Sequence, residues 1–419
     1  MIIIDYSIYP RNDVLCIDIR SFYASVEAVK LDLDPMKVML AVVGDTSRPG
    51  SIVLAASPNL KKKYGISNVS RFFELPKDPE IIIVQAHMAD YINISVRITE
   101  LLYHYAPHEA IHQYSVDELW ITVNGLQDLF GNPWQIAELI RQDILDTLGL
   151  TCSIGIGDNK FLAKVVMDLH AKKAGIAECR YEDVANKLWP FHVEDIWGIG
   201  SKMKVNLNRM GIVTLGQLAN YNFGHIKKRF GIMGEQLYWH AWGIDLSPVF
   251  GNFIRTEQKG FGHGITLLRN YTKDEVPACI LDLCEEVCRR TRSANKAGKT
   301  IHLGIAYSKT TGGGFNRSRS ISIPTNITME VYKVCMGLFN QFYDGQSDIR
   351  RVYITLDNLF ENGETQLDLF EDRSKNKDIG FVMDAIRDKY GSTAILRASS
   401  YTDAGITLDR SKKIGGHNA

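Results

Sequence analysis

The chain has 419 residues, of which 45% are hydrophobic and 23% are charged. This composition excludes a disordered or fibrous protein, and the length predicts roughly two to four domains. The 48 basic and 48 acidic residues balance, so the net charge of the whole chain gives no sign of a nucleic-acid partner.

We expect a cytoplasmic protein with no membrane segment. No apolar run approaches the roughly 20 residues that span a bilayer, and the N-terminal stretch MIIIDYSIYPRND carries an acid, Asp5, instead of a basic start. The seven cysteines are odd in number and irregularly spaced, which favours a reducing compartment over a disulfide framework.

Residues 14–178 alternate strand-like and helical patterns, as a mixed α/β domain would. The expected strands are VLCIDI (14–19), IVLAAS (52–57), IIIVQA (81–86), IHQYSVDELWITV (111–123) and TCSIGIG (151–157). The expected helices are SFYASVEAVK (21–30), MADYINISVRITELLYHY (88–105), residues 133–148 and KFLAKVVMDLHAKK (160–173). In the last helix, polar residues recur every four positions opposite an apolar stripe, which is typical of a surface helix and predicts solvent-facing Lys160, Lys164, Asp168 and Lys172.

The pattern changes after this domain. Between Glu182 and Gly243 short helices are punctuated by glycines, as in VEDIWGIGSKMKVNLNRMGIVTLGQLA. From about Phe253 to Leu359 strand-like runs flank helices near 274–294 and 328–343, which predicts a second α/β unit. Beyond Glu361 the chain is polar, contains QLDLF and ends with one amphipathic helix at about 377–390 and a weak tail.

Charge is distributed unevenly in the second α/β unit. From Val287 to Met329 there is no Asp or Glu, whereas the segment has eight basic residues: Arg289, Arg290, Arg292, Lys296, Lys299, Lys309, Arg317 and Arg319. A basic segment on strand-like runs is the pattern expected of a phosphate-binding surface, and a solvated positive face is the alternative. Nearby Cys279, Cys284 and Cys288 lie in an apolar helical pattern, which predicts core packing rather than a metal site.

Two adjacent acids interrupt the strand-like run YSVDELWITV (114–123). If SVDE is the turn of an antiparallel hairpin, Asp117 and Glu118 can face one solvated spot despite the alternation of strand side chains. Asp18 ends another expected strand, and carboxylates on adjacent strand ends suit a hard divalent cation such as Mg²⁺. Spacing alone leaves a metal site and ordinary turn acids both open.

Three motifs occur in order at suitable separations: DIRSFYASVE (18–27), YSVDELWI (114–121) and SIGIGDNKFLAK (153–164). Together they resemble the Y-family, or translesion, DNA polymerases of the UmuC/DinB type, and most of all the UmuC-like branch of Gram-positive bacteria. The resemblance covers about residues 12–360, and the length of each motif argues against chance agreement.

The resemblance implies an α+β multidomain, right-hand polymerase. Its parts would be a ferredoxin-like palm, small fingers, a helical thumb with a helix-hairpin-helix element and an α/β little finger. The implied divisions are palm at 1–30 and 79–178, fingers at 31–78, thumb at 179–248, little finger at 249–360 and a C-terminal tail with a clamp-binding peptide at 361–419.

The implied activity is error-prone, DNA-dependent DNA synthesis past damaged template bases, in which a primer 3′-hydroxyl attacks the α-phosphate of a dNTP. Asp18, Asp117 and Glu118 would be the catalytic acids and, with the backbone carbonyl of Ile19, would hold two Mg²⁺ ions. The sequence has no separate block of acidic motifs typical of a proofreading exonuclease. The two alternatives are a nucleotidyl cyclase and an inactive, clamp-bound DNA adaptor.

The nucleotide contacts follow from the same resemblance. Tyr23, beside Phe22, matches the steric gate, whose ring would collide with a ribose 2′-hydroxyl, and helix packing is the alternative for both residues. In SPNLKKKYG, Lys62 stands where the family often has an arginine that binds the triphosphate, and Lys61 or Lys63 could serve instead. Lys172 matches a contact to the β- and γ-phosphates, with Lys173 as the alternative because of an apparent one-residue insertion near His170.

The implied partners are primer-template DNA and the β sliding clamp. The WGIG turn would present backbone N–H groups to phosphate, and the basic segment would follow the duplex. The expected DNA contacts are Gly198, Gly200, Lys202, Arg289, Arg292, Arg317 and Arg319, and the expected clamp contacts are Gln366, Leu367, Leu369 and Phe370. We also predict that the helix near Asp378–Tyr390 makes a protein contact, and we leave open whether a UmuD-like or recombinase partner is required.

Overall fold

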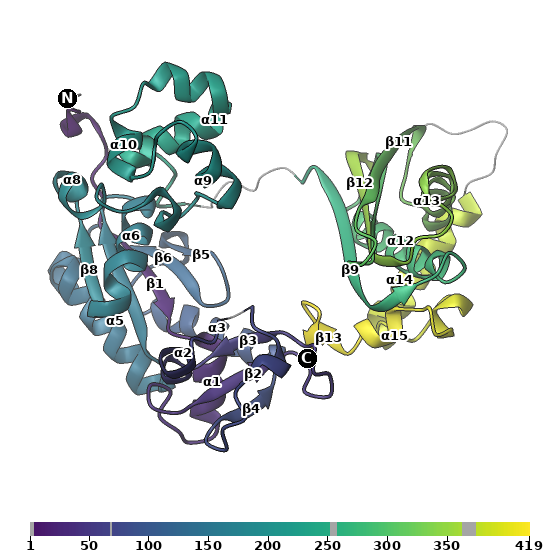
Figure 1. Cartoon of the computed structure of the whole chain (residues 1–419), viewed down its shortest axis with the longest axis horizontal. Coiled ribbons are helices and arrows are strands. Elements are labelled where there is room, and N and C mark those ends of the chain that lie inside the picture. The colour runs from purple at the N-terminus through teal and green to yellow at the C-terminus, as the bar shows by residue number, and fades with distance from the viewer. Residues whose placement is uncertain (1–3, 68, 252–257, 363–373) are drawn as a thin grey trace. The chain divides into compact units, whose positions relative to one another are not determined.

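The computed structural model describes residues 4–67, 69–251, 258–362 and 374–419. The chain forms two compact units: unit 1 is Met1–Ile254 with His417–Ala419, and unit 2 is Arg255–Gly416 (Figure 1). Within the described ranges, no helix combines the length and hydrophobicity needed to cross a membrane.

The main sheet of unit 1 carries the predicted acids. It has five strands in the order β5 (Ile111–Gln113), β6 (Glu118–Thr122), β1 (Val14–Ile19), β7 (Cys152–Gly157) and β8 (Ile176–Cys179). The central strand β1 runs antiparallel to both neighbours and pairs Asp18 with Glu118 on one side and with Ser153 on the other. β5 and β6 form the expected hairpin, with residues 115–117 in its turn.

Helices flank this sheet and a smaller one. The helices of this part are α1 (Phe22–Lys30), α3 (Met88–Leu102), α4 (Gln127–Phe130), α5 (Pro133–Leu148), α6 (Lys160–Val166) and α7 (Lys172–Ala174), with a π-helical turn, η4 (Met167–Ala171), between the last two. The smaller sheet has the order β3 (Val53–Ala56), β2 (Leu40–Val43), β4 (Ile82–Gln85), and α2 (Pro58–Tyr64) follows β3. β2, β3 and α2 lie in the range expected to be the fingers (31–78), whereas β4 lies in the range expected to be the palm.

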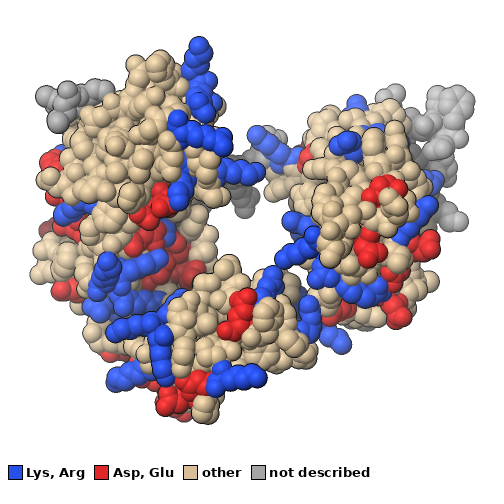
Figure 2. Space-filling view, in the orientation of Figure 1, with Lys and Arg blue, Asp and Glu red and all other residues tan. Residues whose placement is uncertain are grey.

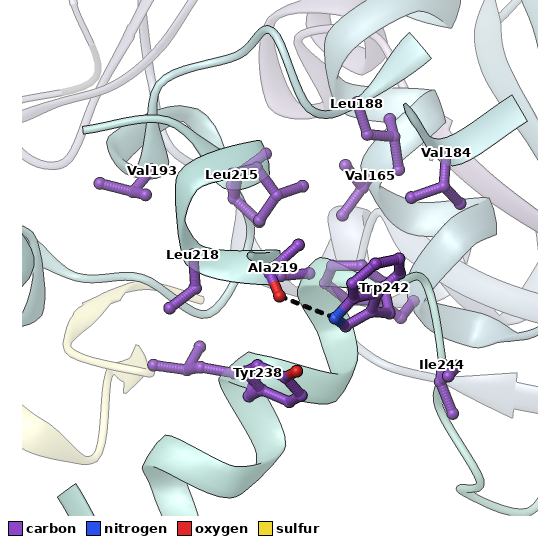
Figure 3. Close-up of a cluster of buried hydrophobic side chains, with 14 of the residues drawn as sticks. Val165, Val184, Leu188, Val193, Leu215, Leu218, Ala219, Tyr238, Trp242 and Ile244 are labelled. Carbon is purple, nitrogen blue, oxygen red and sulfur yellow. Dashed lines mark hydrogen bonds between the residues drawn. The ribbon is translucent and has the colours of Figure 1, made fainter. Parts of the chain in front are cut away.

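A group of helices follows at the position expected for the thumb. They are α8 (Val184–Lys187), α9 (Ser201–Asn208), α10 (Leu215–Ala219) and α11 (Phe223–Ala241). Their core, shown in Figure 3, is closed by Trp242, whose indole Nε1–H donates to the carbonyl oxygen of Ala219 at 2.9 Å. Short 3-10 helices occupy Tyr6–Ile8, Phe72–Glu74, His108–Ala110, Tyr181–Asp183, Val193–Asp195 and, in unit 2, Ala398–Tyr401.

Helix α6 lies between two hydrophobic cores. Ala163 packs against the palm sheet, while Val165 belongs to the helical core of Figure 3. Lys160 and Lys164 are consequently only 7% and 5% exposed. The prediction of a solvent-facing polar side is therefore wrong for these two lysines, because the helix is covered on more than its apolar stripe.

Two glycines of the motif SIGIG let α6 lie directly on β7. A Cβ atom added at Gly155 would stand 2.1 Å from the carbonyl oxygen of Ala163, and one at Gly157 would stand 2.5 Å from the Ala163 nitrogen. Both neighbours are backbone atoms, which cannot rotate away. Glycine is thus required here by close approach rather than by an unusual φ angle.

We predict that Gly155→Ala lowers the free energy of unfolding by about 1–3 kcal/mol, because the added methyl group overpacks the contact between strand and helix. Urea unfolding followed by circular dichroism measures this effect. Gly50→Ala is the matched control, since nothing lies within 4 Å of a Cβ at that position. Equal unfolding midpoints for the two variants would contradict the assigned contact.

Unit 2 is an α/β domain with one four-stranded sheet. The strand order is β11 (Gly314–Thr325), β10 (Lys296–Tyr307), β12 (Ile349–Glu361) and β9 (Gly260–Tyr271), all antiparallel. Helices α12 (Val276–Ser293) and α13 (Thr328–Phe342) pack on the sheet through a common core. Cys279, Cys284 and Cys288 are completely buried in that core, which confirms the packing interpretation.

Part of the predicted C-terminal tail belongs to unit 2. Its elements in unit 2 are α14 (Ser374–Tyr390), α15 (Thr407–Arg410) and β13 (Lys413–Ile414), whereas the last strand, β14 (His417–Asn418), is assigned to unit 1. The buried guanidinium of Arg292 on α12 forms a bidentate ion pair with Asp384 on α14 at 2.6 and 3.0 Å. Glu285 on α12 accepts from Arg387 at 3.3 Å and from Arg397 at 3.0 Å. The contact of α14 seen here is therefore made within the chain.

Candidate active site

The three predicted acids lie at one end of β1 and β6. Asp18 stands directly opposite Glu118 in antiparallel register, and paired residues project from the same face of a sheet. Asp117 precedes β6 in the turn, where its Oδ1 accepts from Ser115 Oγ at 2.6 Å. The backbone N–H of Ile19 donates to the Asp117 carbonyl at 2.9 Å, which ties the turn to the end of β1.

Each of the paired acids faces a lysine from the segment that follows β7. Lys164 Nζ lies 2.7 Å from Glu118 Oε2 and 3.0 Å from Asp168 Oδ2. Lys172 Nζ lies 2.7 Å from Asp168 Oδ1 and 3.8 Å from Asp18 Oδ2. Because Glu118 and Lys164 are both buried, removing either one would leave an uncompensated charge away from water.

The carboxyl group of Asp18 is held in an unfavourable environment. Burial raises its pKa to about 6, the nearby lysines Lys172 and Lys164 oppose the rise, and Asp117 and Glu118 add to it. In the metal-free protein, ionising Asp18 therefore costs more free energy in the folded state than in the unfolded chain, and this difference destabilises the fold. This cost grows as the pH rises from the unfolded value, about 3.8, through the folded value.

We predict that Asp18→Asn stabilises the metal-free protein at pH 7 by about 1–3 kcal/mol, because the amide carries no charge to bury. The gain should shrink as the pH falls from 7 to 5, since wild-type Asp18 then takes up a proton. Thermal unfolding of the wild type and the variant in EDTA, from pH 7 to pH 5, measures this difference in stability. A variant less stable than the wild type at pH 7 would show that the carboxylate stabilises the fold.

The donor chemistry of this site fits Mg²⁺, which prefers carboxylate and carbonyl oxygens. Within the described part of the chain, no three acid, histidine or cysteine side chains already converge on one point. Glu118 and Asp18 instead face the ammonium groups of Lys164 and Lys172. Cations thus already neutralise part of the acidic charge, and the acids would have to turn from them to hold a metal ion.

Tyr23 lies close to the acids. Burial raises the pKa of the Tyr23 phenol, and the carboxylate of Asp117 raises it further. Its ring stacks on Tyr91 with 4.4 Å between centroids, and the Tyr91 hydroxyl donates to the buried carboxylate of Glu27 at 2.8 Å. Phe22 is 3% exposed and packs against both tyrosine rings, which supports the packing alternative for that residue.

Of the three lysines on α2, Lys61 turns toward the acids. Its Nζ donates to Ser21 Oγ at 3.3 Å, and burial, followed by repulsion from another lysine, lowers its pKa. Lys62, placed at the arginine position, is exposed, and Lys63 pairs with Asp78 at 3.2 Å. The arrangement therefore brings the alternative Lys61, rather than Lys62, to the site.

Two neighbours of Asp18 in sequence also shape the site, although neither was predicted as a site residue. Arg20 donates to Ser153 Oγ at 3.0 Å and to the carbonyl oxygen of Lys172 at 2.6 Å. Ser21 has φ 47°, a left-handed conformation that is costly for a residue with a Cβ atom and is often found at functional sites. Their place in the motif DIRSFYASVE, directly after an acid, is the signal that could have found them.

The predicted DNA contacts of unit 1 lie at the start of α9. Gly198 has φ +92° in the turn before the helix, and Gly200 is the residue that precedes its first turn. A Cβ at either glycine would meet no atom within 4 Å, so no neighbouring side chain packs on the turn at those two positions. Lys202 is exposed in the first turn of the helix.

The predicted DNA contacts of unit 2 differ in exposure. Arg317 and Arg319 are exposed on β11, and the Arg289 side chain is 36% exposed. Arg292 is a correction: its side chain is 2% exposed and is neutralised by Asp384, so it cannot reach a nucleic acid. Figure 2 shows Lys and Arg atoms interspersed with Asp and Glu atoms on the visible surface of the chain.

The predicted clamp contacts Gln366, Leu367, Leu369 and Phe370 lie outside the described residues. The strand before them, β12, ends at Glu361, and the next described element is α14.

Comparison with known proteins gives consistent matches along the chain. The impB/mucB/samB family matches residues 17–168, its C-terminal domain matches residues 258–369, and the thumb domain of DNA polymerase-iota matches residues 194–245. The UV-damage repair protein UvrX of Bacillus subtilis is 51% identical over 99% of this chain and 100% of its own length. DNA polymerase IV 2 of the same organism is 41% identical over 96% and 98%. A solved Y-family DNA polymerase chimera of Dbh and Dpo4 superposes with a TM-score of 0.65 and 24% identity, covering 84% of this chain and 100% of the chimera.

Proposed function

Because the chain belongs to the Y-family of DNA-directed DNA polymerases, we propose that it copies damaged templates with low fidelity and that Asp18, Asp117 and Glu118 are its metal-binding acids. The observation that carries this proposal is the pairing of Asp18 with Glu118 at adjacent strand ends, with Asp117 in the turn beside them. The expected fold, an α+β multidomain polymerase, agrees with the structural match.

The acids would bind two Mg²⁺ ions, which supply positive charge for an in-line displacement at phosphorus. Lys164 compensates the charge of buried Glu118. Lys172 and Lys61 would bind the triphosphate as point charges. The primer 3′-hydroxyl gives up its proton to solvent and its oxygen forms the new bond to the α-phosphorus, while the bond from that phosphorus to the bridging oxygen breaks and pyrophosphate leaves. The side chains contribute positioning and electrostatics rather than covalent chemistry.

Sequence-independent contacts would hold the primer-template duplex. The N–H groups near Gly198 and Gly200, with Lys202, would bind backbone phosphate from unit 1. The exposed Arg317 and Arg319, with Arg289, would do so from unit 2. Binding through phosphate alone suits an enzyme that must accept templates of any sequence.

We also assign QLDLF at 366–370 as a β-clamp peptide, which would raise the local concentration of polymerase at the primer end. We predict that Leu369→Ala/Phe370→Ala abolishes co-elution with the clamp and leaves extension on a short, clamp-free template within about twofold of wild type. Retained co-elution would assign clamp binding to another segment. We also propose a cytoplasmic location, which suits the seven free cysteines, and leave open whether a UmuD-like or recombinase partner is required.

Primer extension tests the proposed activity directly. The wild-type protein, a 5′-labelled primer-template, the four dNTPs and Mg²⁺ should give extension products, and EDTA should abolish them. Tight DNA binding without any extension would favour the inactive adaptor.

A further inference from the structure

Five charged groups of alternating sign form an open chain beside the proposed metal site. Glu118 contacts Lys164, Lys164 contacts Asp168, Asp168 contacts Lys172, and Lys172 approaches Asp18, with N···O distances of 2.7, 3.0, 2.7 and 3.8 Å. The two ends of this chain, Asp18 and Glu118, are both acids and are strand partners. Asp168 is the only member that stands between two ammonium groups, each of which would otherwise repel the other.

The helix that bears these groups is not a regular α-helix. Lys164 lies on α6 and Lys172 begins α7, while Met167–Ala171 between them form a π-helical turn. A π turn accommodates one extra residue without breaking a helix, and such turns are frequent at functional sites. The apparent insertion near His170 falls within this turn. Lys172, four residues after Asp168, is the lysine that pairs with it.

We propose that Asp168 is a positioning residue that holds Lys172 ready for the β- and γ-phosphates of the incoming nucleotide. This inference rests on the proposed function, in which Lys172 is the phosphate contact. Asp168 acts through Lys172 and touches neither metal nor substrate itself. Its charge keeps the two lysines together and keeps the Lys172 ammonium at 2.7 Å from Asp168 instead of allowing it to move fully onto Asp18, 3.8 Å away.

Two features favour a positioning role over mere surface pairing. The Asp168 side chain is only 24% exposed, and its partner Lys164 is buried, so the carboxylate is fixed from the protein side. Lys172 is 48% exposed, so its ammonium can leave Asp168 for a ligand at small cost. Because the Asp168 carboxylate is fixed and the Lys172 side chain can move, the ammonium group can leave Asp168 and bind a phosphate.

A double-mutant cycle tests the proposal. We would compare wild type, Asp168→Asn, Lys172→Ala and the double variant in single-nucleotide insertion, and measure dNTP binding separately on a dideoxy-terminated primer, where no chemistry occurs. We expect Asp168→Asn to raise both the KM and the Kd for dNTP about tenfold, with kcat within about threefold, and to have no further effect in the Lys172→Ala background. Asp168→Glu, which keeps the charge, should stay within about threefold of wild type.

Asp34→Asn is the matched control, because it removes an exposed Asp–Lys pair of 2.9 Å with Lys37 while keeping the side-chain oxygen that accepts from Met36 N–H. An unchanged KM in an active Asp168→Asn enzyme would overturn the proposal, as would equal effects with and without Lys172. If Asp168→Asn melts at a lower temperature than wild type, Asp168→Glu carries the test, and a tenfold rise in its KM would also overturn the proposal. An inactive wild-type protein would overturn the proposed function and this inference together, whereas an active wild type with a silent Asp168→Asn overturns the inference alone.

Discussion

Asp117→Ala is expected to extend a primer at least about a thousand-fold more slowly than the wild type, because the loss of one acid removes charge that would hold the metal ions and orient the attacking hydroxyl. The free energy of unfolding of this variant should differ little from that of the wild type. The carboxylate is partly exposed, and its assigned hydrogen bond is a single one from Ser115. The measurement is single-turnover extension with Mg²⁺ beside thermal unfolding of the same preparation.

Ser115→Ala provides the matched control for this variant. It removes the same hydrogen bond at 2.6 Å and leaves the carboxylate in place. We expect it to retain extension within about tenfold of wild type, since one hydrogen bond from a hydroxyl to the carboxylate contributes far less than a metal-binding charge. Comparable losses in both variants would mean that the shape of the turn, and not the acid, limits the reaction.

Tyr23→Ala is expected to reduce discrimination against ribonucleotides by about a hundredfold or more, because the ring that would collide with a 2′-hydroxyl is gone. The ring is well fixed for this role. Tyr91 stacks beneath it, and the buried carboxylate of Glu27 holds the Tyr91 hydroxyl. The ratio of kcat/KM for a dNTP to that for the matching rNTP measures the effect.

Tyr103→Ala controls for the general loss of a tyrosine in unit 1, since its side chain is exposed at the end of α3. Its selectivity should equal that of the wild type. If Tyr23→Ala also keeps the wild-type ratio, discrimination against ribose must come from another side chain, and Tyr23 would be a packing residue only.

The sequence located the acids because their chemistry is local. A hairpin turn with two acids and an apolar strand that ends in a third can be recognised from residue types alone, and register then brings Asp18 opposite Glu118. The fold class was predictable for a similar reason, and the structural match confirms it. Each of the three long motifs specifies a succession of secondary-structure elements, and few folds contain all three successions in this order.

The interior position of α6 could not be predicted in this way. Four-residue spacing distinguishes one side of a helix from another, but it does not say what covers the polar side. The contacts that cover α6 come from the palm sheet and from the helical core that includes Trp242, far away in sequence. Lys164 therefore looked like a surface residue, although it neutralises Glu118.

Arg292 and the C-terminal tail illustrate the same limit in unit 2. A stretch without acids appears to be a positive surface, yet the partner of Arg292 is Asp384, 92 residues later in the chain. Pairing over such separations depends on tertiary structure, which local charge patterns do not report. For Arg317 and Arg319 the local prediction of exposure agrees with the structure, because they lie on the outermost strand in the sheet order.

The most direct test of the account is synthesis across a lesion. We would follow extension of one primer on an undamaged template and on the same template with a single abasic site, using the wild-type protein and Asp117→Ala/Glu118→Ala with Mg²⁺ and dNTPs. We predict full-length products from both templates with the wild type and from neither with the double variant. Products that persist in the double variant would contradict the assignment of these acids. A wild type that copies the undamaged template but stops before the abasic site, and equally before a UV photoproduct and a bulky guanine adduct put in its place, would contradict a translesion polymerase.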